Sequence, residues 1–342
     1  MVWRQQSRKK PSGNTPDISE KRHKKGPTLA CDLMFIGHVS IDRIENQHGV
    51  RVQAGGAALY AAIAAKTLLK DVALVSAVGK DYKFKDALRL LGFDYIRTLN
   101  MSSTRFNIRY NKHEEAEYLQ ADYGAGSRIS ASAIPTQLLG PETMVHISPM
   151  RPVKVDKIVK KIREASPKTK ISMNTWIDYI KKNRRNRRIL KNLASEADFF
   201  ILNDHEAKSL AETASISTAF TLLKAKMLII TLGELGAIIS KENQEIQMVP
   251  ALNTPTRNVV DTTGAGDVWC GAFLAAFKLT EDLMKSVTIA SILSSIKCSG
   301  WNFQKLISLR FRKPDEVIEY IIGMREGALQ KRILDYTMYK EI

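Results

Sequence analysis

Residues 261–273 read DTTGAGDVWCGAF, and this stretch decides how the rest of the chain is interpreted. An apolar pair at 259–260 precedes it, and Phe273 and Phe277 follow at helical spacing. The pattern predicts a strand, a glycine turn (residues 262–266) and the N-terminus of a helix. Glycines let main-chain N–H groups converge on an anion, and the helix dipole adds positive potential there. Three amides are expected to form this anion hole, those of Gly264, Ala265 and Gly266.

Asp267 lies in the first turn of the expected helix, directly after the glycine turn. A carboxylate in this position can accept the proton of an attacking hydroxyl group that docks within hydrogen-bond reach. A glycine-rich loop followed by a helix-capping aspartate explains the same residues without any catalysis. The local pattern alone leaves both interpretations open.

Towards the N-terminus, short apolar runs alternate with segments of helical spacing. Helices are expected at 57–69 and 84–91. The apolar runs predict strands at 33–36, 72–78, 144–147, 170–173, 199–202 and 227–231. Strands that alternate with helices indicate a mostly parallel sheet covered by helices on both faces. The fold class is therefore α/β, a doubly wound sandwich.

One region departs from this alternation, because residues 104–120 alternate apolar and polar side chains with no helix between the two halves. That spacing is typical of a β-hairpin. Together with strands at about 41–53, the hairpin would form a small sheet over the site, a β lid. The lid strands either cover their own site or pair with a second copy of the chain, as a homodimer, and their alternating edges permit both.

The stretch 261–273 closely resembles the C-terminal signature of the PfkB family of ribokinase-like carbohydrate kinases. The resemblance implies that the glycines form the anion hole and that Asp267 is the catalytic base. Two further matches lie near the N-terminus. In GHVSID at 37–42, Asp42 corresponds to the substrate-binding aspartate, and Gly55 and Gly56 match the diglycine that lets substrate lie against main chain.

Two more motifs match the same family in the same order. The first, NDHE at 203–206, implies that Asn203 lies near the nucleotide phosphates and that Glu206 organises Mg²⁺. The second is TLGELG at 231–236, of which three residues are expected to border ATP: Thr231, Gly233 and Gly236. The resemblance implies a ribokinase-like sandwich with ATP and Mg²⁺ as cofactors, and also a dependence on a monovalent cation. Its activity would be ATP-dependent phosphorylation of an alcohol hydroxyl of a small sugar, polyol or nucleoside.

The chain departs from the family pattern at two places. Tyr60 stands where many relatives have a sugar-binding asparagine, and it could be an aromatic wall, a single hydroxyl contact with substrate, or a packed helix residue. MNTW at 173–176 replaces a strand end that carries aspartate in many relatives. Asn174 could still face the phosphates, while Trp176 fits a core position equally well.

The formal net charge is +17, which suggests an anionic partner without identifying it. Much of the excess lies in residues 1–28, which read as a disordered basic arm, and in the run 181–188. This charge motivates two alternatives to a sugar kinase, a nucleoside kinase and a kinase-fold protein associated with nucleic acid. The kinase domain is expected to cover 29–325, followed by a tail at 326–342.

Sequence features also narrow the cellular setting. No run of about eighteen apolar residues occurs, and the three cysteines are odd in number and widely spaced. We therefore expect no membrane partner and a cytoplasmic protein with reduced thiols. P-loop, protein-kinase and zinc-binding motifs are absent from the sequence.

Overall fold

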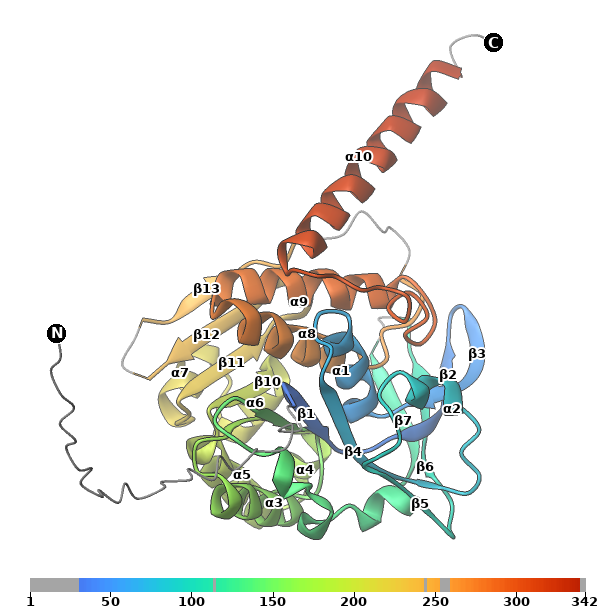
Figure 1. The fold of residues 1–342 in the computed structure, drawn as a ribbon. Helices are drawn as coiled ribbons and strands as arrows, with labels where there is room; N and C mark the ends of the chain where they lie inside the picture. The colour runs from blue at the N-terminus through green and yellow to red at the C-terminus, as the bar shows by residue number, and fades with distance from the viewer. Residues whose placement is uncertain (1–30, 113–114, 243–244, 253–258, 339–342) are drawn as a thin grey trace, which may run out of the picture.

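The computed structural model describes residues 31–112, 115–242, 245–252 and 259–338, with side chains up to residue 327 (Figure 1). The expected basic arm at 1–28 lies outside the described residues. Within them, one large sheet, helices on both of its faces and a smaller second sheet make up the molecule.

The large sheet has the strand order β13-β12-β11-β10-β9-β8-β1-β4-β5. Neighbours pair in parallel from β11 to β5, whereas β12 and β13 are antiparallel additions at one edge. The six strands expected from the sequence are all present in this sheet. Its bounds are β1 (Leu33–Ile36), β4 (Val72–Gly79), β5 (Ile96–Leu99), β8 (Met144–Ile147), β9 (Lys170–Asn174), β10 (Phe199–Asn203), β11 (Met227–Thr231), β12 (Ala237–Lys241) and β13 (Gln247–Val249).

Helices cover both faces of this sheet because each central strand is apolar on both sides. In β1, Leu33 and Phe35 point into one core and Met34 and Ile36 into the other. The first core is covered by α1 (Ala57–Lys66), α8 (Ala265–Thr280) and α9 (Leu283–Cys298). The second core is covered by α3 (Pro152–Ala165), α5 (Arg184–Glu196), α6 (Asp204–Ala211) and α7 (Ile216–Leu222). The doubly wound α/β sandwich expected from the sequence is confirmed.

The smaller sheet has the strand order β3-β2-β6-β7 and lies at one side of the sandwich (Figure 1). Its strands are β2 (Ser40–Asn46), β3 (Gly49–Gly55), β6 (Thr104–Tyr110) and β7 (Ala116–Asp122). Ile44 and Ile108 pack on Trp301 beneath the sheet, so its inner face has a small apolar core of its own. These four strands form the small sheet expected from the sequence, here called the lid, and its covering of the site stays a prediction.

The segment before the glycine turn is not a strand, which corrects the expectation for residues 259–260. The N–H groups of Val260 and Asp261 both donate to the carbonyl of Cys298, at 2.8 and 3.3 Å. Val260 packs against the apolar core under the lid instead of a neighbouring strand. This segment is therefore held by the end of α9 and by the lid, not by the large sheet.

Helices α1 and α8 approach closely because Gly271 has no side chain. A Cβ atom on Gly271 would lie 1.9 Å from the carbonyl oxygen of Ala61. The close packing brings Tyr60 of α1 against the glycine turn that begins α8. The sequence of α8 therefore sets the position of the turn as well as its chemistry.

Short helices α2 (Lys85–Arg89) and α4 (Ile177–Lys182) complete the body, and α10 (Asp315–Met338) projects from it (Figure 1). Val317 and Ile321 anchor the start of α10 in the first core. The helix is continuous across residue 325, where the sequence led us to end the kinase domain, and that boundary stays a prediction. None of the helices in the described ranges is long and apolar enough to cross a membrane.

Candidate active site

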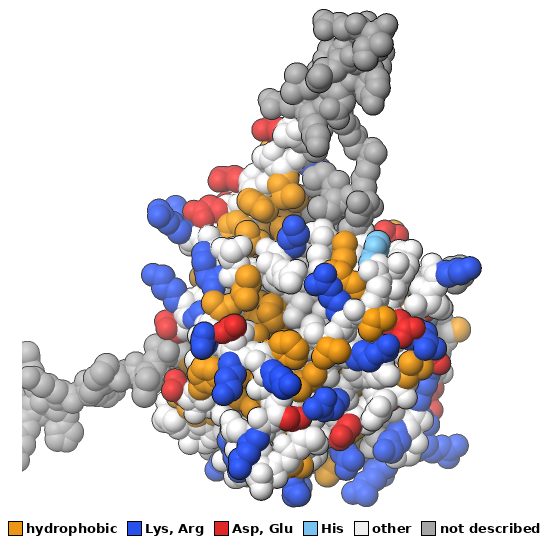
Figure 2. Space-filling model, turned by 90° about the vertical axis from the view of Figure 1, so that its right-hand side faces the viewer, with side chains coloured by type: hydrophobic (Ala, Val, Ile, Leu, Met, Phe, Trp, Pro, Cys, Tyr) orange, Lys and Arg blue, Asp and Glu red, His pale blue; other side chains and the backbone are white. Residues whose placement is uncertain are grey.

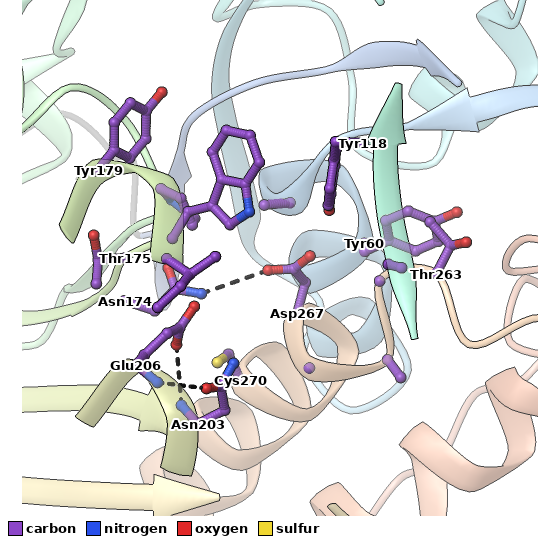
Figure 3. Close-up of a pocket in the computed structure, with 18 of the residues that line it drawn as sticks. Tyr60, Tyr118, Asn174, Thr175, Tyr179, Asn203, Glu206, Thr263, Asp267 and Cys270 are labelled. Atoms are coloured by element: carbon purple, nitrogen blue, oxygen red, sulfur yellow. Dashed lines mark hydrogen bonds between the residues drawn. The ribbon is translucent and has the colours of Figure 1, made fainter. Parts of the chain in front are cut away.

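A cavity of about 1030 Å³ lies where the carboxyl ends of three parallel strands meet the lid and the start of α8 (Figure 3). Asn174, Asn203 and Thr231 are the last residues of β9, β10 and β11, and all three line it. Asp42 of the lid and Asp267 of α8 line it as well. Ligands of open α/β sheets bind at this end of the strands. The volume is at the upper limit of the range of about 300–1,000 Å³ for single-ligand pockets, which leaves room for two ligands.

The glycine turn adopts a conformation that only glycine tolerates well. Gly264 has φ = 74°, and a Cβ atom on it would lie 2.4 Å from the ring of Tyr60. The N–H of Ala265 donates to the carbonyl of Thr262 at 3.0 Å, so the turn itself uses this amide. Among the described residues, the N–H groups of Gly264 and Gly266 have no hydrogen-bond partner. The expected anion hole therefore depends on these two amides, and the amide of Ala265 closes the turn.

Asp267 lies in the first turn of α8 and points toward Asn174 at the end of β9 (Figure 3). The side-chain amide of Asn174 donates to Asp267 Oδ1 at 3.5 Å, a long contact. Desolvation raises the pKa of Asp267 to about 7, and Asn174 and Lys297 only partly oppose this shift. A carboxylate with this pKa exchanges protons readily near neutral pH, as a general base requires.

Asp42 is buried at the base of the lid, with its Oδ1 lacking a hydrogen-bond partner in the described structure. Burial, together with the negative charges of Asp261 and Asp267, raises its pKa to about 7, although hydrogen bonding from Ser40 and the Gly56 N–H opposes part of the shift. A Cβ atom on Gly55 would lie 1.7 Å from Asp42 Oδ2, and one on Gly56 would lie 2.2 Å from a main-chain oxygen. Gly55 thus makes the space that Asp42 occupies, although it does not line the cavity, whereas Gly56 lines the cavity and lets the chain pass close to the main chain of His38.

Asn203 and Glu206 form a capping box at the start of α6 (Figure 3). The Asn203 side chain accepts from the Glu206 N–H at 2.8 Å, and Glu206 Oε2 accepts from the Asn203 N–H at 3.0 Å. Burial raises the pKa of Glu206 to about 8, with Asp267 and Asp204 adding to the shift. The motif therefore has a structural role in the helix cap, and it also places a poorly solvated carboxylate on the cavity wall.

The turn after β11 lies only partly at the cavity. Thr231 lines it, whereas Gly233 and Gly236 do not. Gly236 has φ = 111°, and a Cβ atom there would lie 2.1 Å from the carbonyl oxygen of Val249. These glycines shape the connection into β12, and their expected contact with ATP stays a prediction. The neighbouring residues 253–258 are outside the described structure.

Tyr60 is fully buried on the cavity side of α1. Its ring lies beneath Gly264 and 5.8 Å from the ring of Phe303, and its hydroxyl accepts a hydrogen bond from Gln53 Nε2 at 3.3 Å. This geometry favours the packed helix residue among the three possibilities that the sequence left open. A direct contact between Tyr60 and substrate remains untested.

Sequence reasoning missed two groups of residues at this site. One is the buried pair of Asp261 and Lys297 under the glycine turn. A lysine at the end of the apolar stretch 286–296 was the available signal, because an ammonium group is rarely buried without a partner. The other group is a set of five rings that line the cavity: Phe106, Tyr118, Tyr123, Trp176 and Tyr179. They come from the lid, the segment after it and the segment after β9, which no local pattern connects.

Known proteins with similar sequences are kinases of small molecules. A cytidine kinase of Thermococcus kodakarensis is 28% identical over 265 residues, which cover 75% of this chain and 92% of that protein. An ATP-dependent 6-phosphofructokinase of Thermoanaerobacterium thermosaccharolyticum is 25% identical, over 78% of this chain and 87% of that one. A nucleoside kinase of Methanocaldococcus jannaschii is 24% identical, over 77% of this chain and 89% of that one.

Solved structures share the fold. A Burkholderia thailandensis nucleoside kinase in complex with inosine superposes with a TM-score of 0.69 at 19% identity, covering 85% of this chain and 99% of that one. A ribokinase of Giardia lamblia gives 0.71 at 19% identity, with the same coverage of each chain. The sequence also matches the family described as pfkB family carbohydrate kinase over residues 31–305, the greater part of the chain. The chain belongs to the pfkB family of carbohydrate kinases.

Proposed function

We propose that the protein transfers the γ-phosphoryl group of ATP to a hydroxyl group of a small sugar, polyol or nucleoside, with Asp267 as the general base. The observation that carries this proposal is the position of Asp267. Its carboxylate has a pKa of about 7, it faces the cavity, and it directly follows two glycine amides that have no partner in the described structure. A proton acceptor next to an anion-binding turn is the arrangement that phosphoryl transfer to an alcohol needs.

In the proposed reaction, Asp42 accepts hydrogen bonds from substrate hydroxyls through its unpartnered Oδ1. Asp267 takes the proton of the attacking hydroxyl. The oxygen then forms a bond to the γ-phosphorus while the bond from that phosphorus to the bridging oxygen of ADP breaks. Negative charge that develops on the transferred group would be stabilised by the amides of Gly264 and Gly266. The lid would exclude water that could otherwise hydrolyse ATP.

Mg²⁺ is the metal that the proposal requires, and Glu206 is the residue that would hold it together with its waters. In the described part of the chain, no cluster of three or more His, Cys, Asp or Glu side chains could hold a metal ion. Mg²⁺ takes few protein ligands and keeps several waters beside the phosphates, so a single carboxylate on the cavity wall, Glu206, suits it. The raised pKa of Glu206 also fits, because a nearby cation would favour its ionised form. When bound, the ion would neutralise phosphate charge.

A nucleoside is the substrate class that the cavity favours within this proposal. Tyr118 and Trp176 lie 4.8 Å apart between ring centroids with their planes tilted by 58°, and Trp176 lies 5.7 Å from Tyr179. Tyr118 is 43% exposed, so part of its ring is available to a ligand. Stacking of a base on an aromatic ring contributes about 1–3 kcal/mol, whereas a bare pentose has no comparable π-face. Relatives named as cytidine kinase and nucleoside kinase agree with this preference.

The experiment is a measurement of ATP-dependent phosphorylation across nucleosides, pentoses, hexoses and inositols, with wild type and Asp267→Asn compared on any substrate that reacts. We expect turnover of a nucleoside and a fall of about 10²–10⁴-fold in kcat for the variant. Asp86→Asn is the matched control, because this aspartate is exposed on α2 and pairs only with Arg89. Equal rates for Asp267→Asn and wild type would overturn the role of Asp267. Turnover of a sugar alone would overturn the nucleoside preference.

The nucleic-acid alternative has less support in the structure. On the face in Figure 2, Lys and Arg side chains are distributed with acidic and apolar side chains between them. In the basic run 181–188, Arg187 pairs with Glu212 at 3.3 Å, and the other five basic residues are exposed. RNA binding that weakens steeply with salt, together with no turnover in the panel, would favour this alternative over the kinase. A cytoplasmic location and a homodimer joined through the lid also remain proposals.

A further inference from the structure

Lys297 is a fully buried lysine directly beneath the glycine turn. It lies in the last turn of α9, its side chain has 0% exposure, and its Nζ donates to the main-chain oxygen of Asp261 at 2.5 Å. The same Nζ lies 3.3 Å from Asp261 Oδ2 and 5.5 Å from the centroid of the Tyr60 ring. A carbonyl, a carboxylate and an aromatic face are the groups that solvate a cation when water is absent.

Asp261 joins this ammonium group to the turn. Its Oδ1 accepts from the N–H of Thr263 at 2.9 Å, within the turn. Its Oδ2 accepts from Gln53 Nε2 at 3.1 Å and from the N–H of Asn302 at 2.9 Å. A single carboxylate therefore connects β3, the glycine turn and the segment after α9, and Lys297 balances its charge.

The directions of the pKa shifts agree with a charged pair. Desolvation acts to raise the pKa of Asp261, but the Lys297 charge and the hydrogen bonds to Asp261 outweigh it and hold the pKa below its usual range. Desolvation lowers the pKa of Lys297, and Asp261 opposes that shift. The Lys297 charge also acts to lower the pKa of Asp267, although burial of Asp267 has the larger effect. The field of the ammonium group thus reaches the proposed base.

A soluble monovalent cation, which the family resemblance implies, does not fit at this position. K⁺ is bound in proteins by oxygen atoms such as main-chain carbonyls, so a dissolved cation beneath this turn would have to use the oxygens of Asp261. Asp261 offers both kinds of oxygen, and Lys297 already occupies both. Adding K⁺ there would bring a second positive charge against a buried ammonium group.

We propose that Lys297 is a built-in monovalent cation, a positioning residue that orders the glycine turn through Asp261 and makes the protein independent of K⁺. The chain supplies from α9 the positive charge that a dissolved ion would otherwise supply. The activity test of this inference rests on the proposed kinase function, whereas its stability test does not.

The wild-type protein gives the first test. Its melting temperature and its phosphorylation rate are measured in tetramethylammonium, Na⁺, K⁺ and NH₄⁺ chlorides at equal ionic strength. We expect no specific effect of K⁺ or NH₄⁺ on either quantity. A rate that rises several-fold, or a melting temperature that rises, specifically with K⁺ would overturn the proposal. If no substrate is phosphorylated, the kinase proposal fails, and the melting temperatures still test this one.

Lys297→Ala gives the second test, because it opens space for a small cation beside Asp261. We expect a lower melting temperature and a rate lower by about tenfold or more. K⁺ or NH₄⁺ should restore both quantities, whereas tetramethylammonium, which is too large, should not. Lys297→Met is neutral and fills the space, so it should not be rescued. Lys278→Ala, which removes a lysine paired with Asp32 and the Glu142 carbonyl, is the control and should show no specific cation effect.

Two results with the variants would overturn the inference. One is a folded Lys297→Ala protein that keeps the wild-type rate in tetramethylammonium. The other is a folded but impaired Lys297→Ala protein that no small cation rescues, which would mean that Lys297 contributes packing alone. If Lys297→Ala does not fold in tetramethylammonium, refolding in K⁺ or NH₄⁺ would support the proposal. If the variant folds in none of these salts, the wild-type cation series decides the question.

Discussion

The aspartates at the two ends of the glycine turn differ in how fully their carboxylates are hydrogen-bonded and in the direction of their pKa shifts. Before the turn, Asp261 accepts hydrogen bonds from three groups besides its ion pair with Lys297. After the turn, the side chain of Asp267 has one hydrogen bond within the described ranges, a long contact with Asn174. Across the cavity, Asp42 has an Oδ1 without any partner in the described structure. The pKa of Asp261 is held below its usual range, whereas the pKa values of Asp42 and Asp267 are raised to about 7.

This difference indicates a structural role for the aspartate before the turn and a chemical role for the aspartate after it. A buried carboxylate that is fully paired is costly to disturb and has little capacity left for a ligand. A buried carboxylate that is poorly paired costs stability, and it persists where a ligand completes its interactions. Asp261 therefore sets the shape of the turn, while Asp42 and Asp267 are available to substrate. The predictions below test this separation.

Asp261→Asn is expected to have the largest effect on stability. It leaves the Lys297 ammonium buried without a charge partner, and breaking a buried pair in this way costs about 3–5 kcal/mol. Urea unfolding of the apo protein measures the change. Asp86→Asn, on the exposed surface of α2, should stay within about 0.5 kcal/mol of wild type. A loss below about 1 kcal/mol for Asp261→Asn would contradict a structural role for this pair.

Asp42→Asn should act in the opposite direction and stabilise the apo protein at pH 8, by about 1–3 kcal/mol. The folded-state pKa of about 7 lies above the ordinary value of 3.8, so folding disfavours the ionised form. That cost is absent below about pH 4 and complete above about pH 7. The gain measured by urea unfolding should therefore shrink when the pH is lowered from 8 to 5. Stability lost at pH 8 would show that Asp42 is part of the framework, as Asp261 is.

The pH dependence of kcat/KM should report the two cavity aspartates together. Both must be ionised for the proposed reaction, so kcat/KM should fall below about pH 7, with a slope that approaches two in a logarithmic plot. With saturating Mg²⁺, which holds Glu206 in its ionised form, Asp42→Asn should be slower, and its acid limb should have a slope of one, because Asp267 is then the remaining titrating member of the aspartate pair. An acid limb near pH 4 in the wild type would mean that neither carboxylate has the raised pKa that its burial indicates.

Most of the fold was predictable because its strands are local apolar runs. The lid was predictable as well, because its alternation differs from the two-sided burial of the central strands. Residues 259–260 were the exception, since two apolar residues before a turn do not reveal which element will pair with them. The carbonyl of Cys298, about forty residues away, binds this segment, and no local pattern encodes that contact.

Those parts of the candidate site that come from single sequence motifs were predictable. Asp42, Asp267 and Glu206 all line one cavity, as a shared site requires. The amide of Ala265 was expected to bind an anion. In the structure this N–H donates to the carbonyl of Thr262, and that hydrogen bond closes the turn. Lys297 was missed for a different reason. Its role depends on how α9 packs under a loop, which is a property of tertiary structure.

Tyr110→Phe should have the smallest effect of the predicted changes. The Tyr110 hydroxyl lies 2.9 Å from Thr263 Oγ1, and this hydrogen bond joins lid strand β6 to the glycine turn. One such bond contributes about 1 kcal/mol, so kcat/KM should fall roughly 3–10-fold. Thr263→Val removes the same bond, and the double variant should therefore lose little more than either single variant.

Tyr320→Phe, in an exposed residue of α10, serves as the control and should leave kcat/KM unchanged. Measured additivity of Tyr110→Phe and Thr263→Val would mean that the two hydroxyls act independently and that the lid and the turn are not coupled by this bond. Non-additivity would mean that this bond couples the lid to the glycine turn. The lid would then be linked to Asp267, which directly follows the turn. Thr263 would then join the structural aspartate to the lid, because its N–H donates to Asp261 and its hydroxyl bonds Tyr110 of the lid.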